Sequence, residues 1–261
     1  VSSLAFRQSG TIRDLLGTSK KVEKGLKKGW ITKVMYLQPH IRSGYNICPF
    51  ATKGCSRSCL VDTGNLLYPS VRKAMLSKTL LWLFYPRYFL NQLVMEIFKF
   101  SLEAKFSDKK PAIRLNGTSD IPWYKYLNIQ ALYEETGIRF YDYTKWPLQA
   151  KSLPSRDAYS LTFSISEDEK SWERAFDYLD RGYSAAVVVA QQGKNTLKGA
   201  RQAQEKLVNQ GHLDFMGRRF QTIHGDDDDL RMLDENGGLV VLYAKGRALK
   251  EDSPFVHRIT L

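Results

Sequence analysis

Short apolar segments alternate with helical patterns along most of this 261-residue chain. Residues 185–190 are apolar throughout, as expected of a strand that is covered on both faces. The other predicted strands are residues 31–37, 112–116, 138–143, 159–164, 219–223 and 239–243. Helices are predicted at residues 69–106 with a break at Pro86, 123–135, 167–181 and 197–209. This alternation predicts a single α/β domain with a parallel sheet, closed or partly closed as a (β/α) barrel.

Polar residues follow the predicted strands one after another. The pairs after the strands are Asn116 with Asp120, Thr144 with Lys145, Ser164 with Ser166, Gln191 with Gln192 and His224 with Asp226, followed by the single residue Lys245. In an α/β barrel the segments after the strands meet at one mouth, where functional sites lie. The alternative is that each pair belongs to a solvated loop or a helix cap, because loops are polar in any protein.

All three cysteines of the chain lie within twelve residues. Six residues separate Cys48 from Cys55, and three separate Cys55 from Cys59. Cysteines that cluster in this way usually share a ligand. Cys55 and Cys59 are four residues apart, a spacing that predicts one face of a helical turn, and Gly54 allows a tight turn before it.

Three states of the cysteines are compatible with this spacing. Structural zinc takes four protein ligands, so a fourth would come from elsewhere, such as His40 or Asp62. A [4Fe–4S] cluster held by three thiolates keeps one iron open for a small molecule. Unligated thiols or a redox disulfide are the third alternative. The absence of a nearby fourth ligand favours the iron–sulfur cluster.

The chain is strongly basic, with 39 Lys and Arg against 27 Asp and Glu, a net charge of +12 and a pI of about 9.5. This surplus favours a nucleic acid or nucleotide as partner, although a basic surface also serves solubility. Residues 1–30 form a basic lead before a domain at residues 31–261. Its lysines at 20, 21, 27 and 28, with Trp30 close by, could contact phosphates and stack on a base, or form a solvated charged segment.

Two further segments bear on location and metal binding. Residues 76–100 are the most apolar stretch, but too many polar residues interrupt it for a membrane span, and residues 1–10 do not resemble a secretory signal. We therefore expect a soluble, intracellular protein with no membrane partner. The run at 224–229, His-Gly-Asp-Asp-Asp-Asp, has the composition of a divalent-cation loop without the spacing of a calcium site. The alternative is that its aspartates cap a short helix through Met232.

Six motifs give the chain a family resemblance. They are Asn-Ile-Cys-Pro-Phe-Ala at 46–51, Gly-Cys-x-x-x-Cys-Leu at 54–60 with a Gly at 64, Arg-Leu-Asn-Gly-Thr-Ser-Asp at 114–120, Tyr-x-Tyr-Thr-Lys at 141–145, Gly-Asp-x-x-Asp-x-Arg at 225–231 and Ala-Lys-Gly-Arg-Ala at 244–248. In this order they resemble an uncharacterised protein family encoded by tailed bacteriophages, over about residues 20–250. The resemblance implies a viral protein that acts in the cytoplasm of the infected host cell.

More distantly the chain resembles the radical-SAM enzymes, which carry three cluster cysteines in a loop after the first strand of a partial α/β barrel. That resemblance implies a [4Fe–4S] cluster on Cys48, Cys55 and Cys59, with S-adenosylmethionine as a possible second cofactor.

The expected ligand-binding residues lie at the ends of the predicted strands at 112–116 and 138–143. They are Asn116, Asp120, Tyr143 and Lys145. Asp120 and Lys145 can orient a zwitterion through opposite charges, and Tyr143 offers a ring or a hydroxyl donor. The alternative is a Lys–Asp ion pair that only ties two loops together. His224, Asp226 and Lys245 are second-tier candidates.

Two functional classes follow from these observations. The first is a radical-SAM-like enzyme with an open iron, acting on a nucleotide or nucleic acid. The second is a nucleic-acid-binding protein whose cluster is structural or redox-sensing. The sequence does not decide whether the protein is an enzyme, and it leaves the oligomeric state open.

Overall fold

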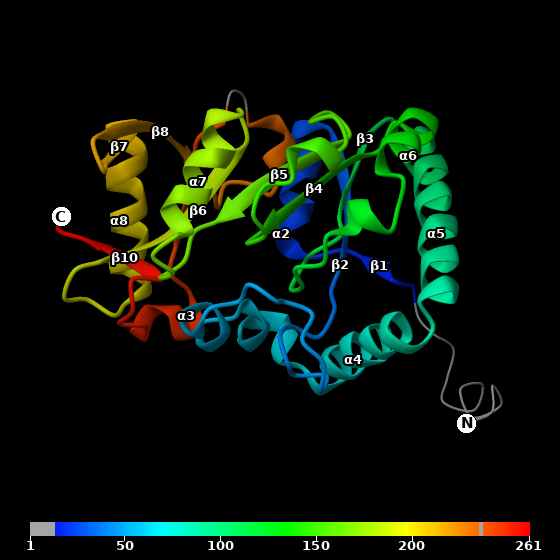
Figure 1. The fold of residues 1–261 in the computed structure, drawn as a ribbon, viewed down its shortest axis with the longest axis horizontal. Coiled ribbons are helices and arrows are strands. Elements are labelled where there is room, and N and C mark those ends of the chain that lie inside the picture. Colours follow the sequence, from blue (N-terminus) through cyan, green and yellow to red (C-terminus); the bar gives the residue numbers. More distant parts are fainter. Residues whose placement is uncertain (1–13, 235–236) are drawn as a thin grey trace.

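The computed structural model describes residues 14–234 and 237–261, which contain one ten-stranded, mostly parallel sheet (Figure 1). The strands are β1 (Leu16–Gly17), β2 (Trp30–Met35), β3 (Lys110–Arg114), β4 (Arg139–Thr144), β5 (Tyr159–Ser164), β6 (Ser184–Gln191), β7 (His212–Phe215), β8 (Arg218–His224), β9 (Leu239–Tyr243) and β10 (Val256–Ile259). Their order is β1-β2-β3-β4-β5-β6-β9-β8-β7, and β10 pairs with β6. The predicted α/β class is therefore confirmed.

Seven α-helices and seven 3₁₀ turns connect the described strands. The α-helices are α2 (Lys20–Glu23), α3 (Lys53–Arg57), α4 (Pro69–Phe84), α5 (Pro86–Ser107), α6 (Ile129–Thr136), α7 (Ser171–Asp180) and α8 (Leu197–Gln210). The 3₁₀ turns are η1 (Lys24–Lys28), η2 (Leu60–Asp62), η3 (Gly64–Leu67), η4 (Trp123–Lys125), η5 (Ala150–Ser152), η6 (Arg231–Leu233) and η7 (Gly246–Lys250). Among these described helices, none is both long and apolar enough to cross a membrane.

The described strands form an open sheet, so the closed form of the predicted barrel is not observed. The outer strands β1 and β7 each pair with one neighbour only, and both pairings are antiparallel. The sheet also forks at β6, because β5 pairs with residues 184–186 and β10 takes over the same edge along residues 188–191. In a closed barrel the two outer strands would pair with each other. Here a short antiparallel strand forms each of these edges.

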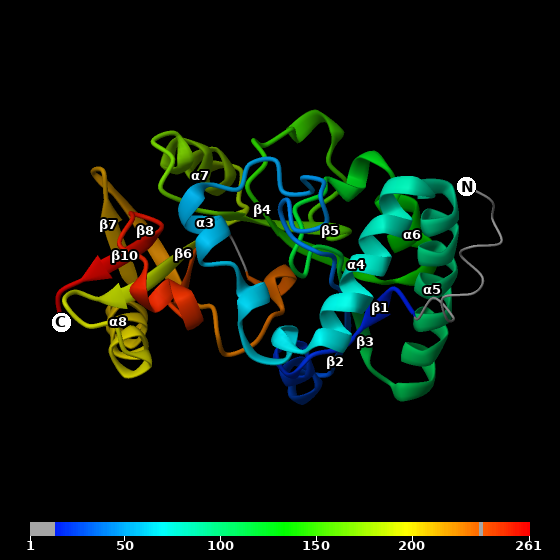
Figure 2. The same ribbon diagram turned by 90° about the horizontal axis from the view of Figure 1, so that it is seen from below.

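The chain crosses the strand ends before it enters the long helices. The segment after β2 contains α3, η2 and η3 and leads into α4, and in Figure 1 this segment and α4 run along the bottom of the view, below the sheet. Figure 2, seen from below, shows α3 and α4 in front of the strands. Parallel strands β2, β3, β4 and β5 therefore end toward the segment that contains the cysteines.

Helix α5 has two apolar faces on opposite sides. One face is buried and contains Phe89, Leu93, Ile97, Phe100 and Ala104, at the three- and four-residue spacing of a helix that packs against a core. The other face is exposed and contains Tyr88, Met95, Leu102 and Phe106, of which Phe106 is 92% exposed. The break between α4 and α5 falls at Pro86, as the sequence predicts.

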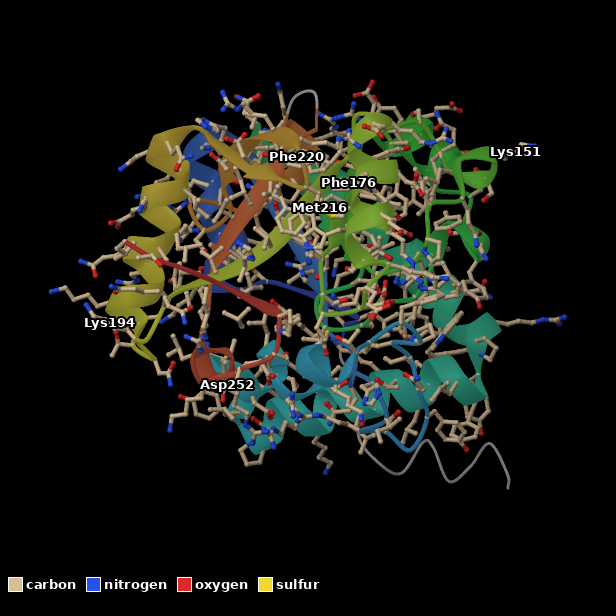
Figure 3. The ribbon with its side chains drawn as sticks, turned by 60° about the vertical axis from the view of Figure 1, so that its left-hand side comes forward. Lys151, Phe176, Lys194, Met216, Phe220 and Asp252 are labelled. Carbon is tan, nitrogen blue, oxygen red and sulfur yellow. The ribbon has the colours of Figure 1, made fainter. Side chains whose placement is uncertain are left out.

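Aromatic stacking attaches the β7–β8 hairpin to α7. Phe176 of α7 stacks on Phe220 of β8 with ring centroids 5.4 Å apart, and Trp172 stacks on Phe215 at 3.9 Å. Figure 3 shows Phe176 and Phe220 beside each other, with Met216 at the turn of the hairpin. The predicted helix at 167–181 begins at Ser171 instead, and the one at 123–135 divides into η4 and α6.

Candidate functional site

A pocket of about 150 Å³ lies between the segment after β2 and the ends of β3, β4 and β5. All three cysteines line it. So do the four expected ligand-binding residues, Asn116, Asp120, Tyr143 and Lys145. Residues that the sequence places more than 90 positions apart thus share one cavity at the carboxyl ends of parallel strands, the usual position of sites in α/β proteins.

Backbone groups hold Cys48 in the wall of the pocket. Its sulfur accepts a hydrogen bond from the His40 N–H at 3.3 Å and lies 3.8 Å from the carbonyl oxygen of Thr118, to which the thiol donates. The amide of Cys48 donates to Asn46 Oδ1 at 2.9 Å. His40 also lines the pocket and has a left-handed backbone with φ of 51°, which is uncommon for a residue other than glycine. An N–H···S contact of this kind stabilises a thiolate or a sulfur ligand.

Cys55 lies in α3, and Thr52 is the N-cap residue of this helix. The Thr52 side chain accepts from Cys55 N at 3.3 Å and donates to Glu167 Oε2 at 2.7 Å. Glu167 Oε1 accepts from Gly54 N at 2.5 Å. The backbone of Gly54 is not left-handed. A glycine at this position lets α3 pack closely against the C-terminal segment, because a Cβ would lie only 2.6 Å from Ser253 Oγ. Gly54 thus lies within the first turn of α3 instead of in a separate turn before Cys55.

Cys59 lies outside α3, which ends at Arg57, and its backbone is extended with ψ of 134°. The prediction that Cys55 and Cys59 share one face of a helical turn is wrong. The chain leaves the helix after Ser58, whose hydroxyl lies 3.5 Å from Glu251 Oε2. Cys59 nevertheless lines the pocket beside Cys55.

All three thiols are free, and burial raises their pKa values. Burial raises the pKa of Cys48 to about 12, against the effect of the His40 N–H. The positive charge of Lys145 opposes burial at Cys55, and that of Arg42 opposes it at Cys59. The thiols also lie close enough for the charge of one to raise the pKa of another. They are therefore protonated at neutral pH unless a cation displaces their protons.

Within residues 14–234 and 237–261, no three His, Cys, Asp or Glu side chains are already gathered around one point as metal ligands. The three cysteines line one pocket without forming such a group. Asp62, one of the alternative zinc ligands, has both carboxylate oxygens bound by arginine guanidinium groups.

Hydrogen bonds to its own surroundings occupy the side chain of Asn116. Its Oδ1 accepts from Ser119 Oγ at 2.8 Å, Ile121 N at 3.0 Å and Trp123 Nε1 at 3.1 Å. Its Nδ2 donates to Ile121 O at 2.9 Å and to Asp142 Oδ2 at 3.2 Å. Asn116 therefore fixes the loop after β3 and has little bonding capacity left for a ligand.

Asp120 and Lys145 are joined through the backbone. Asp120 accepts from Thr144 Oγ1 at 2.7 Å and from Lys145 N at 3.0 Å. The Lys145 ammonium instead donates to the carbonyl oxygen of Ser164 at 2.7 Å and to its hydroxyl at 3.1 Å. Burial raises the pKa of Asp120 to about 6, against these hydrogen bonds. The side-chain ion pair that was the alternative to ligand binding is absent from the described contacts of these two residues.

Two side-chain cations make cation–π contacts with the ring of Tyr143. The Arg114 guanidinium lies 4.8 Å from the ring centroid and Lys21 Nζ lies 5.8 Å from it. Among the described residues its buried hydroxyl has no hydrogen-bond partner. Tyr143 and Arg114 both line the pocket. Arg114 was not among the pocket residues predicted from the sequence, although it is the first residue of the Arg-Leu-Asn-Gly-Thr-Ser-Asp motif at 114–120.

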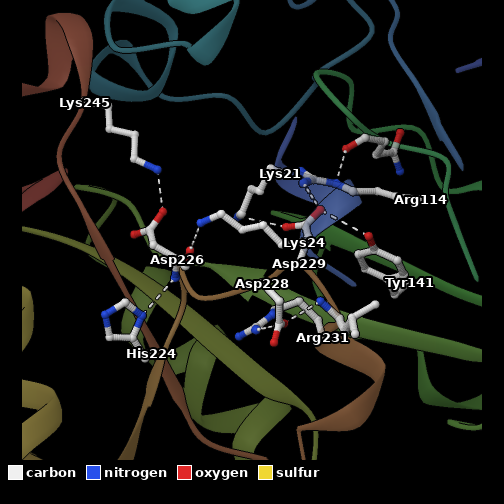
Figure 4. A network of polar contacts seen from close by, with 12 residues as sticks. Lys21, Lys24, Arg114, Tyr141, His224, Asp226, Asp228, Asp229, Arg231 and Lys245 are labelled. Atoms are coloured by element: carbon white, nitrogen blue, oxygen red, sulfur yellow. Dashed lines mark hydrogen bonds and ion pairs between the residues drawn. The ribbon is translucent and has the colours of Figure 1, made fainter. Parts of the chain in front are cut away.

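A buried ionic network adjoins the side of the pocket that Arg114 and Tyr143 line (Figure 4). Asp229, 1% exposed, pairs with Arg114 at 2.9 Å and with Lys21 at 2.8 Å, and it accepts from the Tyr141 hydroxyl at 3.2 Å. Burial alone would raise the pKa of Asp229, but the charges of Lys21 and Arg114 outweigh burial and hold it below its ordinary value. The network ties β3 and β4 to the acidic run at 224–229.

The basic lead binds this acidic run. Lys28 pairs with Asp228 at 2.6 Å, and Lys24 donates to the carbonyl oxygen of Asp226 at 2.7 Å. With Lys21 on Asp229, two lysines of the lead pair with the protein's own carboxylates and a third binds a backbone carbonyl, and Trp30 is buried in β2. Residues 1–13 lie outside the described part of the chain. The lead therefore contributes β1, α2 and η1 to the fold. Lys21 is partly buried, whereas Lys20, Lys27 and Lys28 are exposed to solvent.

His224, Asp226 and Lys245 lie together, but none lines the cysteine pocket. Asp226 pairs with Lys245 and accepts from Gln204 Nε2 at 2.9 Å, and its N–H lies 3.3 Å from His224 Nδ1 (Figure 4). Asp228 accepts from Leu230 N at 2.8 Å just before η6. No side-chain hydrogen bond caps η6, so the helix cap predicted for these aspartates is not observed.

Comparison with known proteins gives one match. The model of the family described as Gene product 88 matches residues 11–259. No curated protein and no solved structure matches the chain.

Proposed function

We propose that this chain, which belongs to the Gene product 88 family of phage-type gene products, binds a [4Fe–4S] cluster through Cys48, Cys55 and Cys59. The observation that supports the proposal is that three free cysteines line one pocket whose opposite wall is polar. Thiolates are the ligands that iron–sulfur clusters take in proteins. Such a cluster, held by three thiolates, supplies one open iron to which a small molecule can coordinate.

The surroundings of the thiols suit a thiolate-rich group. Burial raises the pKa values of Cys55 and Cys59, and the charges of Lys145 and Arg42 oppose this rise, so both cations favour the deprotonated ligand form. The His40 N–H donates to Cys48 Sγ, a second interaction that favours negative charge on sulfur. Ligand binding by all three cysteines requires a movement that brings their sulfurs together, and it releases their protons.

The wall opposite the cysteines offers contacts for a small molecule. Asp120 presents a buried carboxyl group, and Tyr143 presents a hydroxyl that is without a partner among the described residues. An amino group of the ligand fits beside Asp120, and an acceptor fits beside Tyr143. S-adenosylmethionine has both groups, so a radical-SAM-like enzyme acting on a nucleotide or nucleic acid is the finer form of this proposal.

The first experiment is an iron and sulfide assay with an absorption spectrum on protein purified without oxygen. We expect iron and sulfide in stoichiometric amounts, and loss of both in Cys48→Ser, Cys55→Ser and Cys59→Ser taken singly. Ser56→Ala is the matched control, since Ser56 lines the same pocket between two of the cysteines. Stoichiometric zinc without sulfide would contradict the proposal.

The second experiment adds S-adenosylmethionine to the iron-loaded protein. We expect a change in the electron paramagnetic resonance spectrum of the reduced cluster that is weaker in Asp120→Asn and Tyr143→Phe, both with unchanged iron content. An identical response in both variants would remove these residues from the binding site.

The net charge of +12 favours the second candidate function, a nucleic-acid-binding protein with a structural or redox-sensing cluster. In that case DNA binding is salt-dependent and does not change when S-adenosylmethionine is added. Measuring DNA affinity at two salt concentrations with and without S-adenosylmethionine separates the two functions.

A further inference from the structure

Three arginines meet on one carboxylate at the rim of the cysteine pocket. Asp62 ends η2, three residues after Cys59, and its side chain is only 5% exposed. Arg42 binds it with both terminal nitrogens, at 2.8 and 2.7 Å. Arg72 Nη2 lies 3.1 Å from Asp62 Oδ1, and Arg247 Nη1 lies 2.9 Å from Asp62 Oδ2. We call Arg42, Arg72 and Arg247 the arginine trio.

The positive charge of the trio exceeds what Asp62 can neutralise. Three guanidinium groups face one carboxylate, and in the described part of the chain they have no second acidic partner. The side chains of Arg42, Arg72 and Arg247 are 32%, 40% and 66% exposed, so unused N–H donors face water. Hydrogen bonds from Arg42 hold the pKa of Asp62 below its ordinary value, so Asp62 carries one negative charge at neutral pH. The cluster therefore has an excess of two positive charges.

The fold assembles the trio from three distant segments. Arg42 comes from the loop after β2, Arg72 from the first turn of α4, and Arg247 from η7. η7 packs against η2, and at Gly246 a Cβ would overlap the Thr63 side chain, so this position has no room for a larger residue. The Ala-Lys-Gly-Arg-Ala motif at 244–248, which the cluster proposal does not use, thus places an arginine beside the cysteine segment.

We infer that the arginine trio is a binding site for a phosphate group, carried by a nucleotide or by single-stranded nucleic acid. The guanidinium group presents paired donors that match the geometry of phosphate oxygens. Asp62 already holds the three side chains together, so little side-chain freedom is lost when a phosphate binds. Arg42 lines the cysteine pocket as well as binding Asp62. A ligand anchored by its phosphate can therefore extend into that pocket, a consequence that rests on the proposed function, whereas the phosphate site itself does not.

The competing explanation is a structural clamp in which Asp62 ties three segments together and the arginines bind nothing else. A clamp predicts that removing one arginine lowers the melting temperature and leaves phosphate affinity unchanged. A phosphate site predicts loss of affinity at an exposed residue such as Arg247 with little change in melting temperature. Surface ion pairs contribute little to stability, which makes the two explanations separable.

The experiment measures binding of three probes by calorimetry: inorganic pyrophosphate, ATP, and a single-stranded DNA of twelve nucleotides. The proteins are wild type, Arg72→Ala, Arg247→Ala and the control Arg219→Ala. Arg219 is similarly exposed at 68% and pairs with Asp214 on the β7–β8 hairpin, away from the pocket. We expect Arg72→Ala and Arg247→Ala to weaken binding at least tenfold, and Arg219→Ala to change it less than twofold. For the DNA, the dependence of log K on log salt should decrease by about 0.7 for each lost contact.

The outcomes distinguish the sources of the phosphate. Trio-dependent binding of ATP without binding of DNA identifies a nucleotide, and the reverse identifies nucleic acid; both support the site. If no probe binds wild type at millimolar concentration, or if Arg72→Ala and Arg247→Ala bind as wild type does, the inference is wrong. Iron content, measured in the same variants, should be unchanged. Pyrophosphate binding to the Cys48→Ser protein tests the site separately from the cluster.

Discussion

Asp142 is fully buried in β4, where it accepts from Tyr159 Oη at 2.6 Å and from Asn116 N at 2.6 Å. Burial raises its pKa from 3.8 to about 7, against the effect of these donors. The folded protein therefore retains a proton on Asp142 that the unfolded chain has lost between these two values. The stability from this group is complete below pH 3.8 and decreases as the pH rises through about 7.

We expect Asp142→Asn to flatten this pH dependence. While one extra proton is bound, the unfolding free energy of wild type falls by about 1.4 kcal/mol per pH unit. Denaturant unfolding at pH 4.5, 5.5 and 6.5 measures the slope in both proteins. The control is Asp157→Asn, whose carboxylate is 74% exposed and stays in water in the folded and unfolded chain alike. Equal slopes in wild type and Asp142→Asn would contradict the expectation.

Gly54 gives a second prediction at the scale of one residue. A Cβ at this position would lie 2.7 Å from Phe255 Cβ and 2.9 Å from Glu167 Oε1. Gly54→Ala must therefore displace α3 from the C-terminal segment, and we expect a loss of about 1–3 kcal/mol in unfolding free energy. Gly17→Ala is the control, because its nearest atom would be Val34 O at 3.9 Å. Equal stability of the two variants in denaturant unfolding would show that α3 adapts without cost.

The two faces of α5 allow a test within one helix. Phe100 is 2% exposed and packs in the core, whereas Phe106 on the opposite face is 92% exposed. We expect Phe100→Ala to lower the unfolding free energy by about 3–5 kcal/mol, because it leaves a cavity. Phe106→Ala should stay within about 0.5 kcal/mol of wild type. Thermal unfolding of both variants checks the difference, and a large loss at Phe106 would show that its face is covered in solution.

Individual strands were predictable where apolar residues recur along them, continuously in β9 and at alternate positions in β5. β5 and β9 begin and end at the predicted residues 159–164 and 239–243, and both consist largely of buried residues. β1, with two residues, has no pattern to detect, and β10 follows a polar segment. Helix starts were less predictable, since α7 begins at Ser171 after an acidic segment that resembled a first turn.

At the scale of the whole molecule, Asp229 joins the N-terminal lead, the sheet and the acidic run. Its removal leaves the Arg114 and Lys21 charges without their partner. We expect Asp229→Asn to lower the unfolding free energy by about 3–5 kcal/mol, the usual cost of breaking a buried pair. Asp227→Asn, two residues earlier in the run, is the control because its side chain is 68% exposed. Chemical unfolding measures the unfolding free energy of both variants. Similar values would mean that the network contributes little to stability.

The candidate site was predictable in part. The cysteine spacing and the polar residues after two strands pointed to Cys48, Cys55, Cys59, Asp120 and Lys145, which line one pocket. The role of Asn116 could not be read from sequence, since its five hydrogen bonds depend on how the loop after β3 folds. The arginine trio could not be found either, because nothing local to Arg72 or Arg247 indicates that both reach Asp62.

The helix that contains Cys55 has partners made late in synthesis. Arg57 of the cysteine segment binds Glu251, 194 positions further along the chain. At the usual elongation rates of about 5–20 residues per second, the cysteines are synthesised roughly 10–40 s before that partner. During this interval α3 lacks its contacts with Glu251 and Phe255, so the nascent chain is more open to oxidants than the finished protein. Slow translation or a ribosome stalled late in the message therefore exposes the three cysteines to damage that the folded chain resists.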